Sequence, residues 1–482
     1  MTTSKFFRED CYIGGVWRRA AGKTIDVTNP ANGEKIGIVP DFGRDEASAA
    51  IDAAAAAFPA WRAKTADERS KACRAIYEAL MDNQSALGEL LTLEQGKPLS
   101  EAKGEIAYGA AFFKWFAEEA VRVYGDVIPS PWADKRIVVT KEPVGVVASI
   151  TPWNFPTAMI ARKAAAALAA GCPIICKPAS QTPYSALAFG VIADDIGLPK
   201  GLLSVITGAP APIADEFCDN PAVKKITFTG STPIGKQLAA NAMKQMKRIS
   251  MELGGNAPLI IFDDADIDRA VEGAIASKFR NAGQTCVCAN RILVQSGIYD
   301  AFAEKFAKRV AAMKVGDGME TDVEQGPLID EKAVVKVEEH IADARSHGAG
   351  VVTGGERHAL GGTYFQPTVL RDVTSKMLIA NDETFGPVAP LFKFETEADA
   401  IAMANDTEYG LASYLYTNDL GRAWRVMEAL EYGMVAINEG TLSTPVAPFG
   451  GVKESGTGRE GSKYGLDDYL NIKYALFGGL GK

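Results

Sequence analysis

The stretch Val144–Ser180 reads VGVVASITPWNFPTAMIARKAAAALAAGCPIICKPAS. It opens with the apolar run Val144–Ile150, which is typical of a strand buried on both faces. A helix is expected over Pro156–Ala170, because proline suits the first helical turn and Gly171 follows the last residue. A second apolar run, Pro173–Cys176, comes next. The order strand, helix, strand predicts a parallel β-α-β unit.

The alternation of apolar runs and helical patterns continues beyond this unit. Further elements are expected as helices at Thr182–Ile196, Pro210–Asp219 and Ser231–Met243, and as strands at Leu202–Ile206, Lys225–Phe228 and Arg248–Glu252. Strands that alternate with helices in this way are typical of an open, doubly wound parallel sheet. The expected fold class is therefore α/β with a Rossmann-like sheet.

A second α/β series is expected from Pro258 onward. Its strands are expected at Leu259–Phe262, Arg291–Val294, Leu391–Phe394, Ser413–Tyr416 and Val435–Asn438. Its helices are expected at Asp266–Arg280, Tyr299–Met313, Glu331–His347, Glu397–Ala404 and Leu420–Leu430. Two such series in a chain of 482 residues indicate at least two packed domains.

The two ends of the chain follow a different pattern. Before the first series we expect a hairpin around Tyr12–Trp17 and Thr24–Asn29, helices at Arg44–Phe58, Thr65–Met81 and Pro98–Tyr124, and a strand at Arg136–Lys141. Pro59 is expected to stop the first helix just before Trp61, because proline breaks the helical hydrogen-bond ladder. The last segment, Asp467–Phe477, is expected to be a strand outside both sheets.

Composition narrows the classes of partner. The net charge of −9 disfavours nucleic acid, because phosphate binding needs clustered Lys and Arg. No apolar run reaches bilayer length, and the charged opening Met1–Tyr12 does not look like a signal peptide. Seven scattered cysteines and three histidines do not predict a zinc site. We therefore expect a cytoplasmic protein without a metal, nucleic-acid or membrane partner.

Chemically distinctive residues follow four of the expected strands. They are Thr151-Pro152-Trp153-Asn154, Lys177-Pro178-Ala179-Ser180, Thr229-Gly230-Ser231 and Gly254-Gly255-Asn256. Ligands of open parallel sheets bind at the carboxyl ends of the strands. The four motifs are therefore expected to converge on one cleft.

The segment Gly230–Lys236 fits the GxxxxGK part of a phosphate-binding loop between a strand and a helix. The next residue is Gln237, so the hydroxyl that would hold Mg²⁺ is missing. A P-loop phosphotransferase stays open as an alternative from another class, and an ordinary glycine-containing turn stays open as well. The milder functional interpretation is a helix N-terminus that receives a pyrophosphate.

Cys286 lies in the glycine-containing turn GQTCVC and is a candidate nucleophile. No histidine occupies a position from which it could act as a relay, which disfavours a cysteine hydrolase of the papain kind. Glu252, at the end of the fifth strand, is the available base. Most free cysteines are packing residues, so the residue pattern alone leaves that alternative open.

Six motifs in the same order resemble those of the aldehyde dehydrogenase superfamily. They are Thr151-Pro-Trp-Asn-Phe-Pro156, Phe228-Thr-Gly-Ser231, Glu252-Leu-Gly-Gly255, Gly283-Gln-Thr-Cys286, Glu383-Thr-Phe-Gly-Pro387 and Pro448-Phe-Gly-Gly451. The strings FRNAGQTCVCAN at 279–290 and GREGSKYG at 458–465 look like the succinate-semialdehyde dehydrogenase branch. The resemblance implies NAD(P)-dependent oxidation of succinate semialdehyde to succinate. Glutarate semialdehyde or another aldehyde is the alternative substrate, and a non-catalytic protein on the same fold is the alternative in another class.

The resemblance also implies roles for individual residues. Cys286 would form a thiohemiacetal and then a thioester, Asn154 would donate to the oxyanion, and Glu252 would activate water. The cofactor-binding residues implied are Thr151, Pro152, Trp153, Lys177, Ser180, Gly230, Ser231, Leu253, Glu383 and Phe385. Ser180 stands where many NAD-preferring relatives carry an acidic residue, so NADP is expected, with NAD also accepted.

The carboxylate of a semialdehyde needs a cationic anchor. Arg162, Arg280 and Ser443 match the residues that grip it in the succinate-semialdehyde branch, although a solvated or salt-bridged arginine is the ordinary alternative. The domains implied are a cofactor-binding domain of residues 1–124 and 142–253 and a catalytic domain of residues 254–440. Oligomerisation strands at 125–141 and 466–482 imply a homodimer or homotetramer. Cys288 is close enough in sequence to Cys286 for a strained regulatory disulfide, with a buried packing role as the alternative.

Overall fold

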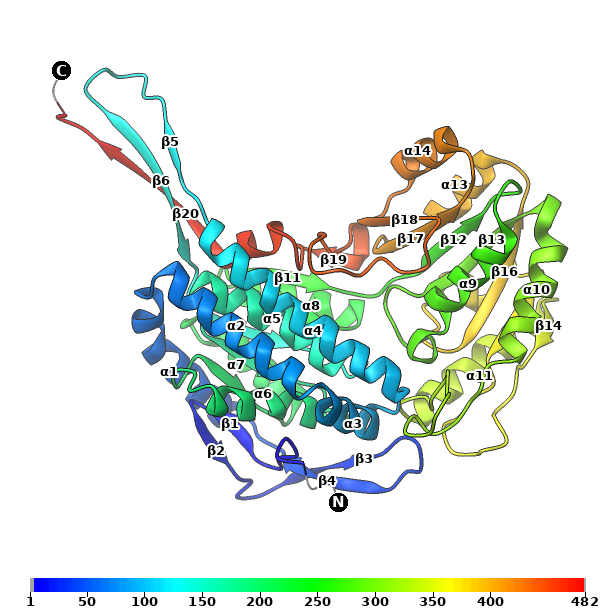
Figure 1. The fold of residues 1–482 in the computed structure, drawn as a ribbon, viewed down its shortest axis with the longest axis horizontal. Helices are drawn as coiled ribbons and strands as arrows, with labels where there is room; N and C mark the ends of the chain where they lie inside the picture. The colour runs from blue at the N-terminus through cyan, green and yellow to red at the C-terminus, as the bar shows by residue number, and fades with distance from the viewer. Residues whose placement is uncertain (1–3, 481–482) are drawn as a thin grey trace.

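The computed structural model describes residues 4–480, and the first half of the chain contributes seven strands of an eight-stranded sheet, which one strand from the C-terminal part completes (Figure 1). Its strands are β1 (Cys11–Ile13), β2 (Val16–Arg18), β7 (Val146–Ile150), β8 (Ile174–Lys177), β9 (Leu203–Val205), β10 (Val223–Thr229), β11 (Arg248–Glu252) and β19 (Gly456–Thr457). They lie in the order β19-β11-β10-β7-β8-β9-β1-β2. The five expected strands, β7 to β11, are mutually parallel, which confirms the α/β class.

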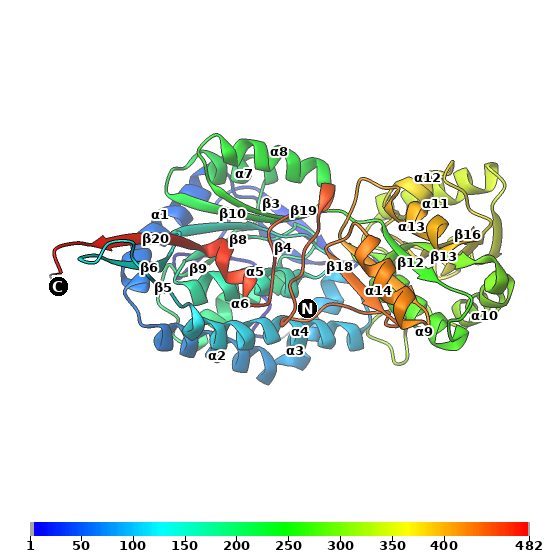
Figure 2. The same ribbon diagram turned by 90° about the horizontal axis from the view of Figure 1, so that it is seen from above.

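Helices cover both faces of this sheet (Figure 2). One face carries α1 (Arg44–Arg62), α7 (Pro210–Asp219) and α8 (Thr232–Met243). The other carries α5 (Pro156–Ala170) and α6 (Tyr184–Asp195), with α2 (Ala66–Asp82), α3 (Gln84–Gln95) and α4 (Leu99–Glu119) packed outside them. The helix α5 is therefore central, with the sheet on one side and other helices on the other.

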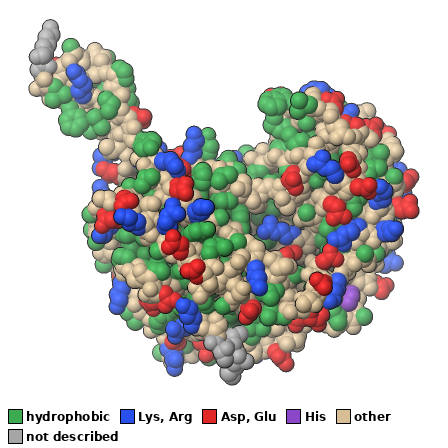
Figure 3. Space-filling model, viewed as in Figure 1, with side chains coloured by type: hydrophobic (Ala, Val, Ile, Leu, Met, Phe, Trp, Pro, Cys, Tyr) green, Lys and Arg blue, Asp and Glu red, His purple; other side chains and the backbone are tan. Residues whose placement is uncertain are grey.

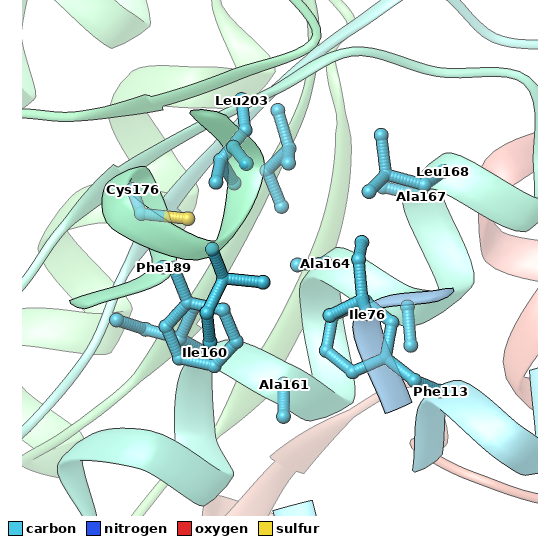
Figure 4. Close-up of a cluster of buried hydrophobic side chains, with 14 of the residues drawn as sticks. Ile76, Phe113, Ile160, Ala161, Ala164, Ala167, Leu168, Cys176, Phe189 and Leu203 are labelled. Atoms are coloured by element: carbon cyan, nitrogen blue, oxygen red, sulfur yellow. The ribbon is translucent and has the colours of Figure 1, made fainter. Parts of the chain in front are cut away.

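The sequence of α5 follows from that position. All its residues are buried, and alanines dominate it because small side chains let α2 and α4 approach closely. Figure 4 shows Ala161 and Ala164 beside the larger Ile76 and Phe113, which come from α2 and α4. Larger residues at the alanine positions would overpack this layer. The tight packing of α5 keeps its first turn, which faces the cleft, in a fixed place.

The second lobe contains a seven-stranded sheet. Its strands are β12 (Ala257–Ile261), β13 (Ala289–Gln295), β14 (Gly350–Thr353), β15 (Thr368–Arg371), β16 (Val388–Phe394), β17 (Ala412–Tyr416) and β18 (Met434–Ile437), in the order β14-β15-β16-β13-β12-β17-β18. Its helices are α9 (Ile267–Lys278) and α10 (Tyr299–Ala311) on one face, and α11 (Glu331–Ser346), α12 (Leu378–Asn381), α13 (Glu397–Asn405) and α14 (Leu420–Ala429) on the other. The five strands predicted for this series are all present.

A three-stranded antiparallel sheet projects away from both lobes (Figure 1). It consists of β5 (Asp126–Ile128), β6 (Arg136–Pro143) and β20 (Leu470–Phe477), so the last strand does lie outside both large sheets. Hydrophobic side chains gather on this arm, among them Val127 and Ile472, which are 76% and 73% exposed (Figure 3). Among residues 4–480, no helix combines the length and the hydropathy needed to cross a bilayer.

The pairing near the N-terminus differs from the prediction. The strand β3 (Thr24–Thr28) pairs with β4 (Lys35–Pro40) and not with the segment around Tyr12–Trp17. That segment forms its own hairpin, β1–β2, because Gly14 and Gly15 both adopt positive φ and close a tight turn. Residues 1–3 and 481–482, which belong to the expected segments 1–124 and 466–482, lie outside the described residues.

Three helical boundaries also differ. The helix α1 runs through Pro59 to Arg62, because a proline in the last turn removes a single bond and the buried Trp61 indole fixes the turn by donating to the Leu168 carbonyl at 3.1 Å. The helix α4 ends at Glu119, and the residues beyond it form a short 3₁₀ turn. The segment Tyr464–Tyr469 is likewise a 3₁₀ helix, so the final strand starts later than predicted.

Candidate active site

Residues from four strand ends meet at one edge of the first sheet, as the parallel topology requires. Asn154 follows β7, Lys177 ends β8, Thr229 ends β10 and Glu252 ends β11, while the second lobe supplies Cys286. A cavity of about 280 Å³ is lined by Pro152, Trp153, Asn154, Met159, Thr229, Gly230, Ser231, Leu253, Gly254, Cys286, Lys336, Glu383 and Phe385. Two larger hollows, of about 730 and 680 Å³, contain none of the expected site residues, so the chemistry points to the smaller cavity.

Cys286 lies just after a short irregular turn at the end of α9. Asn281 and Ala282 in this turn adopt left-handed φ values of 51° and 55°. Gly283 follows at φ 74°, and a Cβ there would lie 2.2 Å from the Gly386 carbonyl oxygen, so only glycine fits. The turn is thereby fixed against the loop that carries Glu383. The thiol itself is partly exposed to the cavity.

Burial raises the pKa of the Cys286 thiol to about 12, although the positive charge of Arg162 acts in the opposite direction. The thiolate is the reactive form of cysteine. In the structure described here the thiol therefore needs a proton acceptor before it can attack a carbonyl carbon.

Asn154 is 4% exposed and its polar atoms are held from several directions. Its Nδ2 donates to the Gln284 carbonyl at 3.0 Å, and its Oδ1 accepts from Phe155 N at 3.1 Å. The side chain therefore does not cap α5. One amide hydrogen is left after the bond to Gln284, since an amide NH₂ carries two.

Glu252 is 2% exposed, and neither carboxylate oxygen has a hydrogen-bond partner among the described residues. Burial raises its pKa well above the usual range, and the charge of Glu460 raises it further. The loop after Glu252 touches the nucleophile turn, because a Cβ on Gly255 would lie 2.4 Å from the Cys286 carbonyl oxygen. An unpartnered buried carboxylate beside a thiol turn is a suitable proton acceptor.

A buried charge cluster accompanies Glu252, and the sequence patterns did not reveal it. Glu460 pairs with Arg162, at 3.1 Å between Oε2 and Nε, and with Lys163. Lys163 Nζ also donates to Thr229 Oγ1 at 2.7 Å. Burial alone would raise the pKa of Glu460, but the charges of Lys163 and Arg162 outweigh it and hold that pKa below its usual value. The adjacent basic residues Arg162 and Lys163 on an alanine-rich helix were the sequence signal that could have indicated this cluster.

Most of the candidate cofactor residues line the cavity, and the others lie at neighbouring strand ends. Lys177 is buried, which lowers its pKa to about 8, and Ser231 occupies the N-cap position of α8. Burial raises the pKa of Glu383 to about 7, against the effect of a hydrogen bond from Gly255 N at 3.3 Å. The rings of Trp153 and Phe385 meet edge to face, with centroids 5.6 Å apart. The remaining candidates are Thr151, Pro152, Ser180, Gly230 and Leu253, at or near the same strand ends.

An apolar slot of about 170 Å³ between α7 and α8 is a further feature that the sequence patterns did not reveal. Its walls are Ile150, Pro210, Ala211, Ala214, Asp215, Phe228, Ile234, Gln237, Leu238 and Asn241. Ile150 and Phe228 precede Thr151 and Thr229, so the slot adjoins the same strand ends. The helical spacing of Ile234 and Leu238 could have indicated an apolar face at this place.

The three substrate-anchor candidates do not line the cavity that contains Cys286. Arg162 is buried against Phe449, with its guanidinium carbon 3.8 Å from the ring centroid. Arg280 lies over Phe155 at 4.9 Å and lines a separate cavity of about 380 Å³. Ser443 lies half-buried in the loop that follows β18.

Cys288 is fully buried, and its sulfur lies 3.3 Å from the Gly283 carbonyl oxygen and 3.7 Å from Lys278 Nζ. Cys286 and Cys288 are both free thiols. These contacts favour the packing role, and a disulfide between the two stays a prediction.

Residues 17–475 match the family model described as "Aldehyde dehydrogenase family". A glutarate-semialdehyde dehydrogenase of Pseudomonas aeruginosa is 60% identical over 478 residues, which cover 99% of each chain. A succinate-semialdehyde dehydrogenase [NADP(+)] of Escherichia coli is also 60% identical, over 479 residues and 99% of each chain. The crystal structure of succinate-semialdehyde dehydrogenase from Burkholderia pseudomallei matches with a TM-score of 0.98 and 57% identity, covering 99% of each chain.

Proposed function

The chain belongs to the aldehyde dehydrogenase family, and on this premise we propose that its substrate is succinate semialdehyde. Membership makes the protein an NAD(P)-dependent oxidoreductase that acts on aldehydes. The single observation that carries the narrower proposal is the position of Arg280. Its guanidinium lies on the ring of Phe155, the residue after Asn154, and forms an ion pair with none of the described carboxylates. The proposal requires the carboxylate of the semialdehyde to reach Arg280 in the cavity of about 380 Å³, which is separate from the one that contains Cys286.

Chemistry starts at Cys286 in this proposal. The thiol passes its proton toward the carboxylate of Glu252, and the sulfur bonds to the aldehyde carbon to give a thiohemiacetal. The free amide hydrogen of Asn154 and the backbone N–H of Cys286 bind the oxygen that becomes negative. Removing one such donor typically costs about 10²- to 10³-fold in rate.

The residues along the cleft fit a dinucleotide in size and chemistry. The apolar slot between α7 and α8 suits a flat base, the N-terminus of α8 at Ser231 suits a pyrophosphate, and Glu383 suits a ribose hydroxyl. A bound nicotinamide would supply the hydride acceptor for the thiohemiacetal. Trp153 and Phe385, whose rings meet edge to face, supply an apolar wall of the cavity. Glu252 first releases the thiol's proton to solvent and then takes a proton from the water that attacks the thioester carbon, so that the C–S bond breaks, the sulfur of Cys286 leaves and the carboxylic acid is released.

NADP is proposed as the preferred cofactor, with NAD also accepted. Lys177 ends β8 and Ser180 follows three residues later, and the two would offer a cation and a hydroxyl to a ribose 2′-phosphate. The Escherichia coli relative that is 60% identical is named as NADP(+)-dependent, which supports the proposal.

Glutarate semialdehyde is the second candidate substrate, because a relative with that activity in its name is also 60% identical. The two substrates differ by one methylene, which a pocket discriminates by only about 10- to 200-fold. Initial rates on succinate semialdehyde, glutarate semialdehyde and butanal, each with NADP⁺ and NAD⁺, test both proposals. Succinate semialdehyde with NADP⁺ should give the highest kcat/KM, and an equal value for butanal would overturn the assignment of a charged substrate.

A homodimer or homotetramer is proposed from the projecting arm. Val127, Ile472 and Tyr474 are between 57% and 76% exposed there, and apolar side chains on a strand edge favour burial against a second copy. The division into a cofactor-binding domain, a catalytic domain and the arm is proposed with the bounds expected from the sequence. Size-exclusion chromatography with light scattering measures the assembly, and a monomer at micromolar concentration would contradict it.

A further inference from the structure

A buried ion pair outside the reacting groups holds Asn154 in place. Lys97 lies in the turn between α3 and α4, and Glu105 lies two turns into α4. Their side chains are both 0% exposed, and Lys97 Nζ lies 2.6 Å from Glu105 Oε2. Two charges removed from water in this way need further partners to offset the loss of hydration. Those partners show what the pair does.

The partners of Lys97 belong to the oxyanion-donor segment. Its Nζ donates to the backbone carbonyl of Asn154 at 2.7 Å and lies 3.8 Å from the centroid of the Phe155 ring. Both hydrogen bonds of the Lys97 ammonium group, to Glu105 and to the Asn154 carbonyl, therefore support this segment. The carbonyl of Asn154 also accepts from Asn281 Nδ2 at 3.1 Å.

The partners of Glu105 belong to the next turn of the same segment. Its Oε1 accepts from Thr157 N at 2.9 Å and from Ala158 N at 3.2 Å, which are free donors of the first turn of α5. A carboxylate at a helix N-terminus is favoured by both hydrogen bonds and the helix dipole. Glu105 therefore fixes the start of α5 immediately after Asn154 and Phe155.

The turn before Cys286, on the other side of the cleft, also contacts α4. Glu101 Oε2 accepts from Asn281 N at 2.9 Å, in the left-handed turn before Cys286. The first two turns of α4 therefore contact both the donor segment and the nucleophile turn. A catalytic amide must be held within a fraction of an ångström to stabilise an oxyanion, so a rigid support of this kind affects rate.

We infer that Lys97 and Glu105 are positioning residues of the oxyanion site, which act on the reaction through Asn154. The inference rests on the proposed role of Asn154 as oxyanion donor. It differs from a general stabilising role, because it requires the effects of Lys97 and Asn154 on kcat to depend on each other.

A double-mutant cycle on kcat tests this dependence. Lys97→Met should lower kcat by about 10- to 100-fold, less than the effect of about 10²- to 10³-fold expected for Asn154→Ala. In the Asn154→Ala background, Lys97→Met should lower kcat by no more than about threefold further, because the amide that Lys97 positions is already absent. NADP⁺ affinity, measured by quenching of tryptophan fluorescence, should stay within about twofold of the wild type.

Glu94→Gln is the matched control. Glu94 is also fully buried and accepts from the first backbone N–H groups of a helix, Tyr184 N and Ser185 N of α6, both at 2.7 Å. Among the described residues it makes no hydrogen bond to Asn154, Lys97 or Glu105. Its variant should lower the melting temperature while leaving kcat and the full effect of Asn154→Ala unchanged. If Lys97→Met does not fold, Lys97→Met/Glu105→Gln removes both charges together and enters the same cycle.

The outcomes distinguish a failure of the positioning role from a failure of the proposed function. A large loss for Asn154→Ala that multiplies fully with the loss for Lys97→Met would overturn the positioning role and leave the proposed function intact. A negligible loss for Asn154→Ala in the wild-type background would instead refute the oxyanion assignment, and the positioning role would be refuted with it.

Discussion

Nε of Arg162 lies 3.1 Å from Oε2 of Glu460, and both side chains are almost completely buried. Glu460 is also the charge that raises the pKa of Glu252, the candidate base. Arg162 is therefore already part of the charge cluster around the base, whereas Arg280 pairs with none of the described carboxylates. The sequence predicted both arginines as substrate anchors, whereas the structure places only Arg162 in an ion pair with a described carboxylate.

Arg280→Ala should reduce kcat/KM for succinate semialdehyde and leave butanal nearly unaffected. The reason is that an arginine–carboxylate contact contributes about 1.5–3 kcal/mol, which corresponds to about 10- to 100-fold. Steady-state rates on the two aldehydes measure the selectivity directly. An equal loss on both would mean that Arg280 supports the fold, and the semialdehyde assignment would lose its main basis.

Arg162→Ala should reduce kcat on both aldehydes. The substitution removes packing against Phe449 and leaves Glu460 with Lys163 as its remaining ion-pair partner. A buried carboxylate that loses a partner perturbs its neighbours strongly. The comparison with Arg280→Ala on the same two substrates is the measurement. A loss confined to succinate semialdehyde would show that Arg162 serves as a substrate anchor despite its ion pair.

The acid limb of the kcat–pH profile should move in opposite directions in two variants. Glu252 must be ionised to act as a base, and its pKa is raised, so kcat should increase with pH. Glu460→Gln removes a negative charge that raises this pKa, so the limb should move to lower pH. Lys163→Met removes a positive charge that lowers it, so the limb should move to higher pH. Shifts of the same sign in both variants would contradict the assignment of the limb to Glu252.

The sequence predicted the parts of the fold that have local signals. The bounds of α5 were predicted correctly because Pro156 and Gly171 mark its ends, and those of α7 because Pro210 suits a first helical turn. The predicted pairing of Thr24–Asn29 with the segment Tyr12–Trp17 and the predicted end of α1 at Pro59 were wrong, since contacts with other parts of the chain decide both.

The candidate site could be predicted only where residues follow strands directly. Asn154 and Glu252 end or follow strands, so parallel topology places them at one edge. Lys97 and Glu460 could not be placed in this way, because they lie 57 and 297 residues from their partners Asn154 and Lys163. Only the packing of α4 and of the C-terminal loop on α5 brings those charges to the cleft.

Ser180→Glu should shift the cofactor preference toward NAD⁺. A carboxylate beside Lys177 would repel the 2′-phosphate of NADP⁺ and could accept hydrogen bonds from the free ribose hydroxyls of NAD⁺. The ratio of kcat/KM for NADP⁺ to that for NAD⁺ should fall by about 10-fold or more, as expected for one lost charge-assisted contact. Ser180→Ala serves as the control, since it removes the hydroxyl without adding a charge. A wild-type enzyme that uses only NAD⁺ would contradict the NADP proposal outright.

Cys286→Ala and Glu252→Gln should stop the reaction at different stages. Without the thiol no covalent adduct can form, so Cys286→Ala should lose turnover completely while still quenching its tryptophan fluorescence with NADP⁺. Glu252→Gln keeps the sulfur but cannot take a proton from water, so the thioester should accumulate. Intact-protein mass spectrometry after mixing with succinate semialdehyde and NADP⁺ should then show an added succinyl group in Glu252→Gln and no addition in Cys286→Ala.

Because Glu252 is the buried carboxylate next to the nucleophile turn, it is also the proposed first acceptor of the thiol proton. If that earlier step dominates, the adduct in Glu252→Gln should form slowly at neutral pH and faster as the pH approaches the raised pKa of Cys286, about 12. Substantial turnover by Cys286→Ala would rule out the covalent mechanism, whereas turnover by Glu252→Gln at the wild-type rate without an accumulating adduct would remove Glu252 from the hydrolytic step.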